Sequence, residues 1–468
     1  MLNLLRTARL YGALVLALVT TLFIASCGGG GDIENELAFR VIHASPDSPP
    51  VNILVDGVTL RSGVDYKGGT ALVFVTPRDY RFGIQALLPG DDALVIDQTV
   101  SLAAGSEFTV LAIGKGATGT VQSLIVENPF EDVPDGNARL QFVHAAPDAP
   151  AVDVYLTAPG ADLLAAVPLD QVTYGSQPAA RKLVPTGTYQ IRVTPAGDAA
   201  TVVFDSGPVA LLRNRDDLLI VLVQNTAAGA SPISLVINDR FSTSELLDMG
   251  TKSDLRVVHV SPDAPALDVV GDPSATATPE ETFASGLTYL GNTGYVSVPP
   301  ETYTVRGVKT SEPNPATPLF SFLRLLSAGQ RATVFATGRL ATINAQVVAD
   351  DIRSVFTEGR LRLLDAAPAS GTVDAYVVAA GTDINTVDPT LRNLVLTSIT
   401  GYQAFAPGNY TITFTTAGTK TVLASQDVAA TAGTVQTVIL VDEVRVDETS
   451  DGNPPAVLVL DDRAGQAG

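Results

Sequence analysis

Hydrophobic and polar residues alternate along much of the chain, most clearly after a recurring turn that contains proline. In the first example Tyr80, Phe82 and Ile84 alternate with Arg81 and Gln85. Successive side chains of a β-strand point to opposite faces, so such a segment buries one face and exposes the other. The proline turn and its tyrosine return at Tyr189, Tyr303 and Tyr410. Each of these segments is predicted to be a half-buried β-strand.

Other short apolar segments follow Ala-Gly turns, as at Ala104-Gly105 and Ala328-Gly329. The chain after residue 27 shows no long apolar repeat with the 3.6-residue period of a helix. Short strands with turn signals about every 8–12 residues are typical of a β-sandwich or barrel. We therefore expect an all-β fold of immunoglobulin-like or transthyretin-like sandwiches, with about seven strands in each.

A longer motif opens each of four repeats that are spaced by about a hundred residues, the length of a whole domain. The first copy reads His43-Ala-Ser-Pro-Asp47, and the fourth has Asp365 and Ala369 at the same two places. Turn-forming joints separate the copies. The predicted divisions are a signal peptide at 1–26, a flexible tether at 27–36, and sandwich repeats at 37–132, 137–249, 253–356 and 359–462. The chain has one cysteine and so no intrachain disulfide, and we expect each domain to depend on its own apolar core.

All three histidines of the chain occupy one position of the repeat, each with an aspartate four residues later. The pairs are His43 with Asp47, His144 with Asp148, and His259 with Asp263. One interpretation is a metal site, but a single pair leaves a zinc site two ligands short. The favoured interpretation is architectural: the histidine ends a strand, and the aspartate accepts backbone hydrogen bonds in a proline-rich turn.

A second repeated acidic position follows within the next strand, at Asp153, Asp268 and Asp374, with Asn52 in the first copy. We interpret it as a solvated strand position, with a calcium ligand as the alternative. Two acidic joints, at residues 132–137 and 447–453, leave interdomain calcium open, although neither fits a full calcium loop. The repeated tyrosines are interpreted as core or tyrosine-corner residues.

The composition argues against several classes of function. The net charge of −20 opposes binding to nucleic acid, which relies on clustered Lys and Arg. The sequence contains no Gly-x-Ser-x-Gly elbow, His-Glu-x-x-His motif, Walker loop or catalytic cysteine. There is no tryptophan, which weakens a stacking type of carbohydrate binding. We expect a protein that is not an enzyme and needs no cofactor.

The N-terminal segment has the order of a secretory signal. Arg6 and Arg9 precede an uncharged apolar run that is too short to span a membrane comfortably, and small residues close it before Cys27. The segment 22–27 resembles the lipobox of bacterial lipoproteins. The resemblance implies cleavage before Cys27 and acylation of that residue, with more than one acyl chain giving stable anchoring. Gly28, rather than Asp, resembles signals that direct lipoproteins to the outer rather than the inner membrane.

The opening motif, together with the tyrosine turns and the Ala-Gly turns, is similar to the domain of unknown function 4397 family. The resemblance implies β-rich extracytoplasmic modules, often in tandem, and carries no activity. We expect a cell-envelope lipoprotein whose string of sandwiches is a spacer or interaction scaffold for an unknown protein or glycan. The alternative is a carbohydrate- or peptide-binding module that assists an envelope enzyme or uptake system; a hydrolase that uses acidic residues is less favoured.

Overall fold

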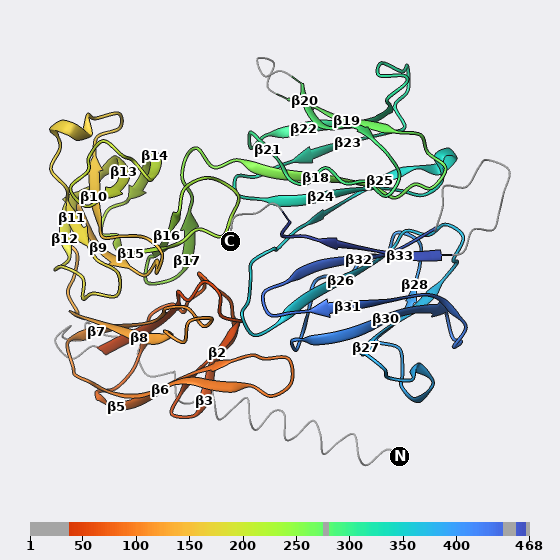
Figure 1. Ribbon diagram of the computed structural model, residues 1–468. Coiled ribbons are helices and arrows are strands. Elements are labelled where there is room, and N and C mark those ends of the chain that lie inside the picture. Colours follow the sequence, from red (N-terminus) through yellow and green to blue (C-terminus); the bar gives the residue numbers. More distant parts are fainter. Residues whose placement is uncertain (1–36, 275–279, 443–454, 465–468) are drawn as a thin grey trace, which may run out of the picture.

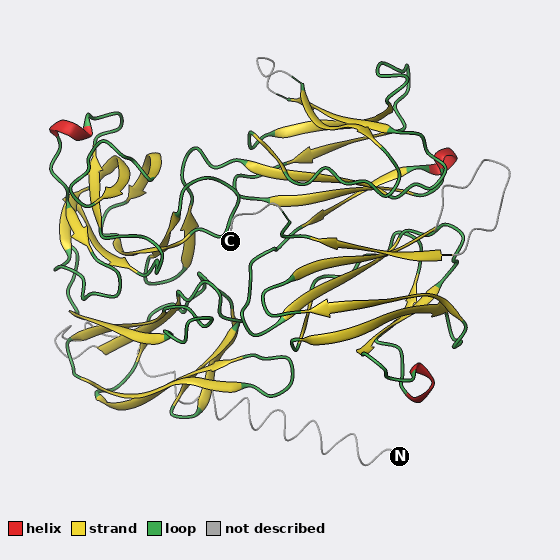
Figure 2. Ribbon diagram, viewed as in Figure 1, coloured by secondary structure: helices red, strands yellow, loops and turns green. Residues whose placement is uncertain are grey.

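The structure is a computed structural model that describes residues 37–274, 280–442 and 455–464. These residues form eight β-sheets that pack two by two into four sandwich units (Figure 1). Strands and loops dominate the chain, as Figure 2 shows. The described residues also include three short 3-10 helices, at Leu163–Ala165, Leu340–Thr342 and Ile384–Thr386. The predicted all-β sandwich fold is confirmed.

The strands follow the chain without mixing between units. The first unit contains β1 (Leu37–His43), β2 (Val51–Val55), β3 (Val58–Val64), β4 (Val73–Phe74), β5 (Arg78–Ala86), β6 (Ala93–Leu102), β7 (Ser106–Ile113) and β8 (Gln122–Pro129). The second contains β9 (Asn137–His144), β10 (Val152–Thr157), β11 (Asp170–Val172), β12 (Lys182–Pro185), β13 (Gly187–Pro195), β14 (Phe204–Leu212), β15 (Asp217–Gln224), β16 (Ile233–Asn238) and β17 (Thr243–Leu246).

The third and fourth units repeat the arrangement of the first. The third contains β18 (Ser253–His259), β19 (Leu267–Pro273), β20 (Glu281–Leu287), β21 (Val296–Val298), β22 (Thr302–Lys309), β23 (Phe320–Leu325), β24 (Arg331–Thr337) and β25 (Asn344–Ala349). The fourth contains β26 (Gly359–Asp365), β27 (Val373–Ala379), β28 (Leu391–Leu394), β29 (Gln403–Phe405), β30 (Gly408–Thr416), β31 (Val422–Ala430), β32 (Val435–Asp442) and β33 (Pro455–Asp461). Short strands such as β4 carry too few residues to show alternation, which is why about seven strands were expected per unit.

Every unit has the same strand order. In the first unit one sheet runs β4-β1-β7-β8 and the other β3-β2-β5-β6, and the second unit adds β17 at one edge. The opening strand pairs in parallel with the strand after the Ala-Gly turn, as in β1 with β7, where Phe39 lies opposite Phe108. The parallel pair places the repeated histidine and the end of the partner strand at the same edge of the sandwich.

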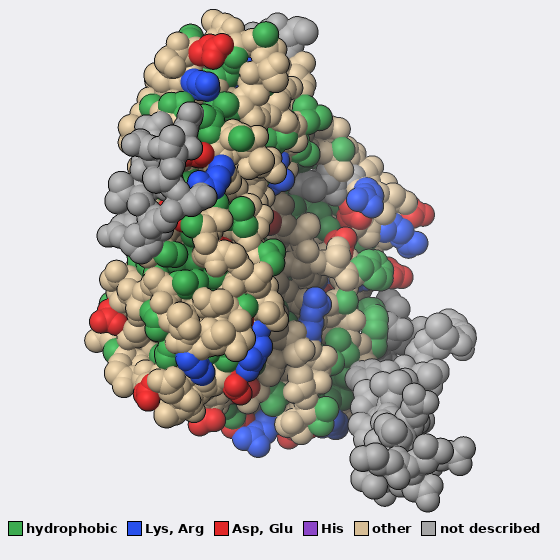
Figure 3. All heavy atoms as spheres, turned by 90° about the vertical axis from the view of Figure 1, so that its right-hand side faces the viewer, with side chains coloured by type: hydrophobic (Ala, Val, Ile, Leu, Met, Phe, Trp, Pro, Cys, Tyr) green, Lys and Arg blue, Asp and Glu red, His purple; other side chains and the backbone are tan. Residues whose placement is uncertain are grey.

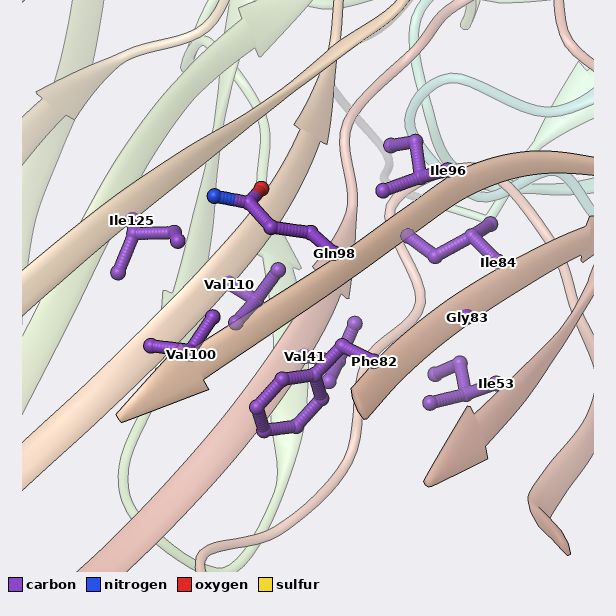
Figure 4. A pocket seen from close by; sticks show the side chains of 10 residues that line it. All are labelled: Val41, Ile53, Phe82, Gly83, Ile84, Ile96, Gln98, Val100, Val110 and Ile125. Atoms are coloured by element: carbon purple, nitrogen blue, oxygen red, sulfur yellow. The ribbon is translucent and has the colours of Figure 1, made fainter. Parts of the chain in front are cut away.

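Each unit has an apolar core between its two sheets. In the first unit Phe39 and Phe82 meet edge to face, with ring centroids 4.9 Å apart. Figure 4 shows Phe82, Val41 and Val110 converging on a cavity of about 10 Å³. A space of that size holds at most one water molecule. The interior of this sandwich is therefore a packed core and not a ligand site.

Two further apolar cores lie between units, where the outer faces of two sheets meet. The first and second units form one pair, in which Ile42 and Leu111 of the first unit pack with Val143 and Val221 of the second. The third and fourth units form the second pair, in which Phe335 of the third unit packs with Leu364 and Ile439 of the fourth. The expectation that each domain depends on its own core alone is thus wrong. The physical reason is that the outer face of each opening strand is buried as well. Its apolar residue (Ile42, Val143, Val258 or Leu364) packs against the neighbouring unit, on a face that also carries a buried arginine.

The two pairs also contact each other, so the units form a compact body and not the expected string (Figure 1). The Arg331 side chain of the third unit donates to the carbonyl oxygens of Thr226 and Ala227 in the second, at 2.9 and 3.1 Å. In the segment that joins the third and fourth units, the amide of Phe356 donates to the Asp47 carbonyl of the first unit at 2.9 Å. Figure 3 shows the outer face of the third and fourth units, with charged side chains of both signs scattered over it.

Candidate functional site

The three histidines end their opening strands β1, β9 and β18, and all three are buried. In each case Nδ1 accepts the backbone N–H two residues later, at 3.4 Å for His43, 3.2 Å for His144 and 3.3 Å for His259. Nε2 lies 3.1, 2.9 and 3.1 Å from the carbonyl oxygen of the proline six residues later. Because Nδ1 accepts a hydrogen bond, Nε2 must carry the proton and donate it. Both ring nitrogens are therefore occupied in holding the turn.

Burial keeps the imidazoles of His43 and His144 neutral. Loss of hydration lowers the pKa of His43 to about 4, and the pKa of His144 is also lowered by burial. Each ring meets a tyrosine edge to face, with centroid distances of 6.3 Å to Tyr66, 6.0 Å to Tyr174 and 6.1 Å to Tyr289. Sequence reasoning missed these tyrosines, although each stands one or two residues before a glycine in the repeat.

In the fourth unit Asp365 replaces the histidine and keeps one of the two hydrogen bonds that the histidine makes. Its Oδ1 accepts the N–H of Ala367 at 3.1 Å, as Nδ1 does elsewhere. The tyrosine position holds Leu396, two residues before the Ser398 carbonyl that accepts from the Asp365 amide. Among the described residues Oδ2 has no hydrogen-bond partner, and burial raises the pKa of Asp365 to about 7. The histidine and its tyrosine are thus replaced together.

Two of the aspartates four residues after the histidines accept backbone hydrogen bonds from loops. Asp47 accepts the N–H groups of Gly116 and Ala117, at 2.8 and 3.0 Å. Asp263 accepts the Leu340 N–H at 2.6 Å, at the start of a 3-10 helix. Asp148 differs, since it forms an ion pair with Lys115 of the first unit. The described residues include no group of three or more His, Cys, Asp or Glu side chains that could hold a metal ion.

The interpretation of the second acidic position as a solvated strand position is wrong for two of its members. Asp153 and Asp374 are buried, not solvated on a strand face, with exposures of 4% and 2%. Asp153 accepts from Gln171 Nε2 and from the Gly197 N–H, at 2.8 and 2.7 Å. Asp374 accepts the N–H groups of Asn393 and Gly418 at 2.8 Å each. Their carboxylates can be buried because these donors replace water.

The other members of this position make similar contacts. The partly buried Asp268 accepts from the Gly286 N–H and the Thr310 hydroxyl, at 2.7 Å each. Asn52 accepts the Gly63 N–H at 3.2 Å and donates to Gln85 Oε1 at 3.1 Å. The position therefore links the second strand of the unit to neighbouring turns and strands.

The four repeated tyrosines form the same corner. Each hydroxyl donates to the backbone carbonyl four residues earlier, at 2.9 Å for Tyr80, 3.0 Å for Tyr189, 2.9 Å for Tyr303 and 2.9 Å for Tyr410. Tyr303 is fully buried in the core of its unit. The ring fills the core and the hydroxyl fixes the turn before the strand. Cys27 and the joint at 447–453 lie outside the described residues.

Buried ion pairs between units are a feature that the sequence did not reveal. In the second pair Arg256 of β18 donates to Asp462 at 2.6 Å, and Arg362 of β26 lies 2.6 Å from Asp350 as an ion pair without hydrogen-bond geometry. In each contact the arginine comes from one unit and the carboxylate from the other. The two contacts are therefore reciprocal, as in an approximate two-fold arrangement. Arg40 of the first pair bridges similarly to Asn238, with 2.7 Å between Nη1 and Oδ1. These contacts fix how the apolar faces are aligned.

A cavity of about 380 Å³ lies where the first and fourth units and the segment joining the third and fourth units meet. Its wall combines apolar and ionisable side chains: Pro50, Asp65, Leu87, Leu88, Pro89, Arg353, Glu358, Arg360, Tyr402 and Ala404. Small-molecule sites are commonly found at domain interfaces and have volumes of about 300–1,000 Å³. This cavity is therefore a candidate ligand site.

Residues 38–155, 253–376 and 377–468 match the family described as "Domain of unknown function (DUF4397)". The matched segments cover well over half of the sequence. The chain belongs to the DUF4397 family. The first matched segment covers the first unit and continues through the opening strand of the second, and the next covers the third unit and continues into the fourth. The chain thus contains DUF4397 domains in multiple copies.

Among curated proteins none matches the chain. One solved structure to which it is similar is the Bacillus anthracis TIE protein, at 10% sequence identity. That likeness covers 86% of this chain and 67% of the other, with a TM-score of 0.17. A TM-score this low carries no argument about fold or function. Among the described residues, no helix is both long and apolar enough to cross a membrane.

Proposed function

We propose that this DUF4397 protein is a non-enzymatic lipoprotein of the bacterial cell envelope, more specifically of the outer membrane. Acyl chains on Cys27 hold it at the membrane, and its four sandwiches form a compact scaffold that presents binding surface to a protein or glycan. The fold supports this role because paired, multiply linked sandwiches make a rigid body. The resemblance of residues 22–27 to a lipobox supports the anchor.

One observation carries the non-enzymatic part of the proposal. The side chains that recur in the repeat, and that would be the candidates for chemistry, are bonded to the backbone or side chains of the protein itself. The His43 imidazole uses both nitrogens in this way: it is uncharged near neutral pH, and its one ring proton is already donated to the Pro49 carbonyl. These residues support turns rather than a reaction.

Acylation is tested by growing bacteria that express the full chain with an alkyne analogue of palmitate. The wild-type chain is expected to take up the label and to sediment with the membranes, and Cys27→Ser is expected to do neither. Ser26→Ala is the matched control, because a small residue remains before the cysteine. An unlabelled wild-type chain, or a labelled Cys27→Ser chain, would contradict membrane anchoring through acylation of Cys27.

The second candidate function is a carbohydrate- or peptide-binding module that assists an envelope enzyme or uptake system. The observation that favours it is the interdomain cavity with its mixed apolar and polar wall. A glycan and peptide array probed with the purified chain distinguishes the two candidates. Selective binding to one class of glycan or peptide supports the module, whereas no binding to any member of the array favours the scaffold.

A further inference from the structure

The cavity between the first and fourth units has two arginines in its wall, and both are already paired within the protein. Arg353 forms an ion pair with Asp65 and donates to the carbonyl oxygens of Pro46 and Ser48, at 3.2 and 2.8 Å. Arg360 donates to Asp351 at 2.6 Å and to the Arg353 carbonyl. Because these guanidinium groups have carboxylate and carbonyl partners, they do not require an anionic ligand.

Glu358 is the wall residue whose carboxyl group has no partner in the described protein. Arg360 Nε also lacks one, but it is fully buried and out of a ligand's reach. Glu358 is buried, with 4% exposure, and lines the cavity. No hydrogen bond or ion pair of its carboxyl group occurs among the described residues, although its backbone carbonyl accepts from Gly433 at 2.8 Å. Burial raises the pKa of this carboxyl group. The carboxyl oxygens are not fully buried, so a ligand in the cavity can reach them and form a hydrogen bond.

The charges around Glu358 select the type of ligand. Asp65 and Asp351 already pair with Arg353 and Arg360. The raised pKa of Glu358 favours its uncharged form, so the wall offers no unpaired charge to a charged ligand. A neutral molecule loses less hydration on entering such a site than a charged one does. Leu87 and Leu88, with the prolines beside them, supply an apolar wall that favours contact with C–H groups.

We propose that this cavity binds a single neutral sugar ring, free or at the end of a glycan. A pyranose has hydroxyl groups around its edge, which donate to the Glu358 carboxyl group, and C–H groups on its faces, which pack against the leucines. The volume of about 380 Å³ is at the lower end of the range of small-molecule sites, as suits one ring. The inference develops the second candidate function and does not depend on the membrane anchor.

Binding at this place also couples the ligand to the arrangement of the units. The cavity wall comes from both pairs, so it exists only while the first unit is docked against the joint between the third and fourth. The joint is held there by Arg353 and by the Phe356 ring, which covers Gly116 so closely that a Cβ there would lie 1.8 Å from a ring carbon. A bound sugar is therefore expected to stabilise the docked arrangement.

The test uses three probes that share one ring and differ in charge: glucose, glucuronate and glucosamine, with galactose and mannose as further neutral hexoses. Binding to the purified full chain is measured by calorimetry and by saturation-transfer NMR. At least one neutral hexose is expected to bind more than tenfold tighter than both charged sugars. Absence of binding by every neutral hexose, or tighter binding of a charged sugar, overturns the proposal.

Two variants locate the site. Glu358→Ala removes the hydrogen-bonding group, and Ala404→Phe fills the cavity from an exposed position that tolerates a larger side chain. Both are expected to weaken binding of the neutral hexose at least tenfold. Glu312→Ala, on an exposed loop of the third unit, is the matched control and should bind as wild type. If Ala404→Phe, with an unchanged circular dichroism spectrum, still binds the hexose normally, the site is not this cavity. The palmitate experiment is unaffected by either outcome.

Discussion

Replacement of Asp365 by asparagine should change the pH dependence of stability, because this carboxyl group is buried where the other units have a histidine. Burial raises its pKa from 3.8 to about 7, and the nearby Asp442, itself buried with a raised pKa, contributes in the same direction. Asp263 and Arg339 of the third unit also act on Asp442. The group is therefore protonated in the folded state at pH values where it is ionised in the unfolded chain.

The sign and size follow from this difference in pKa. Below pH 3.8 both states hold the proton, so ionisation of Asp365 costs no stability. As the pH rises towards 7 the unfolded chain loses the proton first, and the free energy of unfolding falls. Each unit of difference in pKa is worth about 1.4 kcal/mol, so the loss is on the order of 4 kcal/mol and is complete above about pH 7. Asp365→Asn removes this loss.

The assay is urea unfolding of the wild-type chain and of Asp365→Asn, followed by circular dichroism across the pH range. Asparagine keeps the acceptor for the Ala367 N–H but leaves a buried N–H group without a partner, a cost of about 1–3 kcal/mol that does not change with pH. The informative quantity is therefore the change with pH. Relative to wild type, the variant should gain roughly 4 kcal/mol between about pH 4 and about pH 8. A difference that stays constant over that range would refute the reasoning.

Three further predictions test the tyrosine corner, the contact of Phe356 with Gly116, and the interface between the third and fourth units. Tyr303→Phe should lower the free energy of unfolding by about 1 kcal/mol in a urea titration, through loss of one buried hydrogen bond; an unchanged midpoint would contradict the corner. Gly116→Ala should separate the two pairs and enlarge the particle seen in X-ray scattering, whereas Gly401→Ala, which points into open space, should not. Arg362→Met should destabilise the second pair by about 3–5 kcal/mol, because Asp350 stays buried and loses its ion-pair partner; an equally stable variant in the same titration would count against this ion pair.

The strands and turns could be predicted from the sequence because their signals are local. The alternation around Tyr80 and the proline before it depend on neighbouring residues only, and so does the turn that follows His43. The double role of the opening strand was not visible in this way. All seven residues of β1 are buried, but the strand includes Arg40 and His43, and a charged residue on one face indicates solvent rather than a second covered face.

The contacts between units could not be predicted, because they depend on residues that are far apart in the chain. Nothing near Arg256 indicates that its partner is Asp462, more than two hundred residues later. The burial of Asp153 was misjudged for a related reason. An acidic residue between apolar ones is expected to face solvent unless donors are known to surround it, and one of its donors is the backbone of Gly197.

The compact pairing of the four units is the central claim, and small-angle X-ray scattering from the purified chain tests it most directly. A compact body of 468 residues should have a radius of gyration of about 23 Å, with a single-peaked distance distribution. A radius roughly twice as large, with the long tail typical of sandwiches joined end to end, would contradict the pairing.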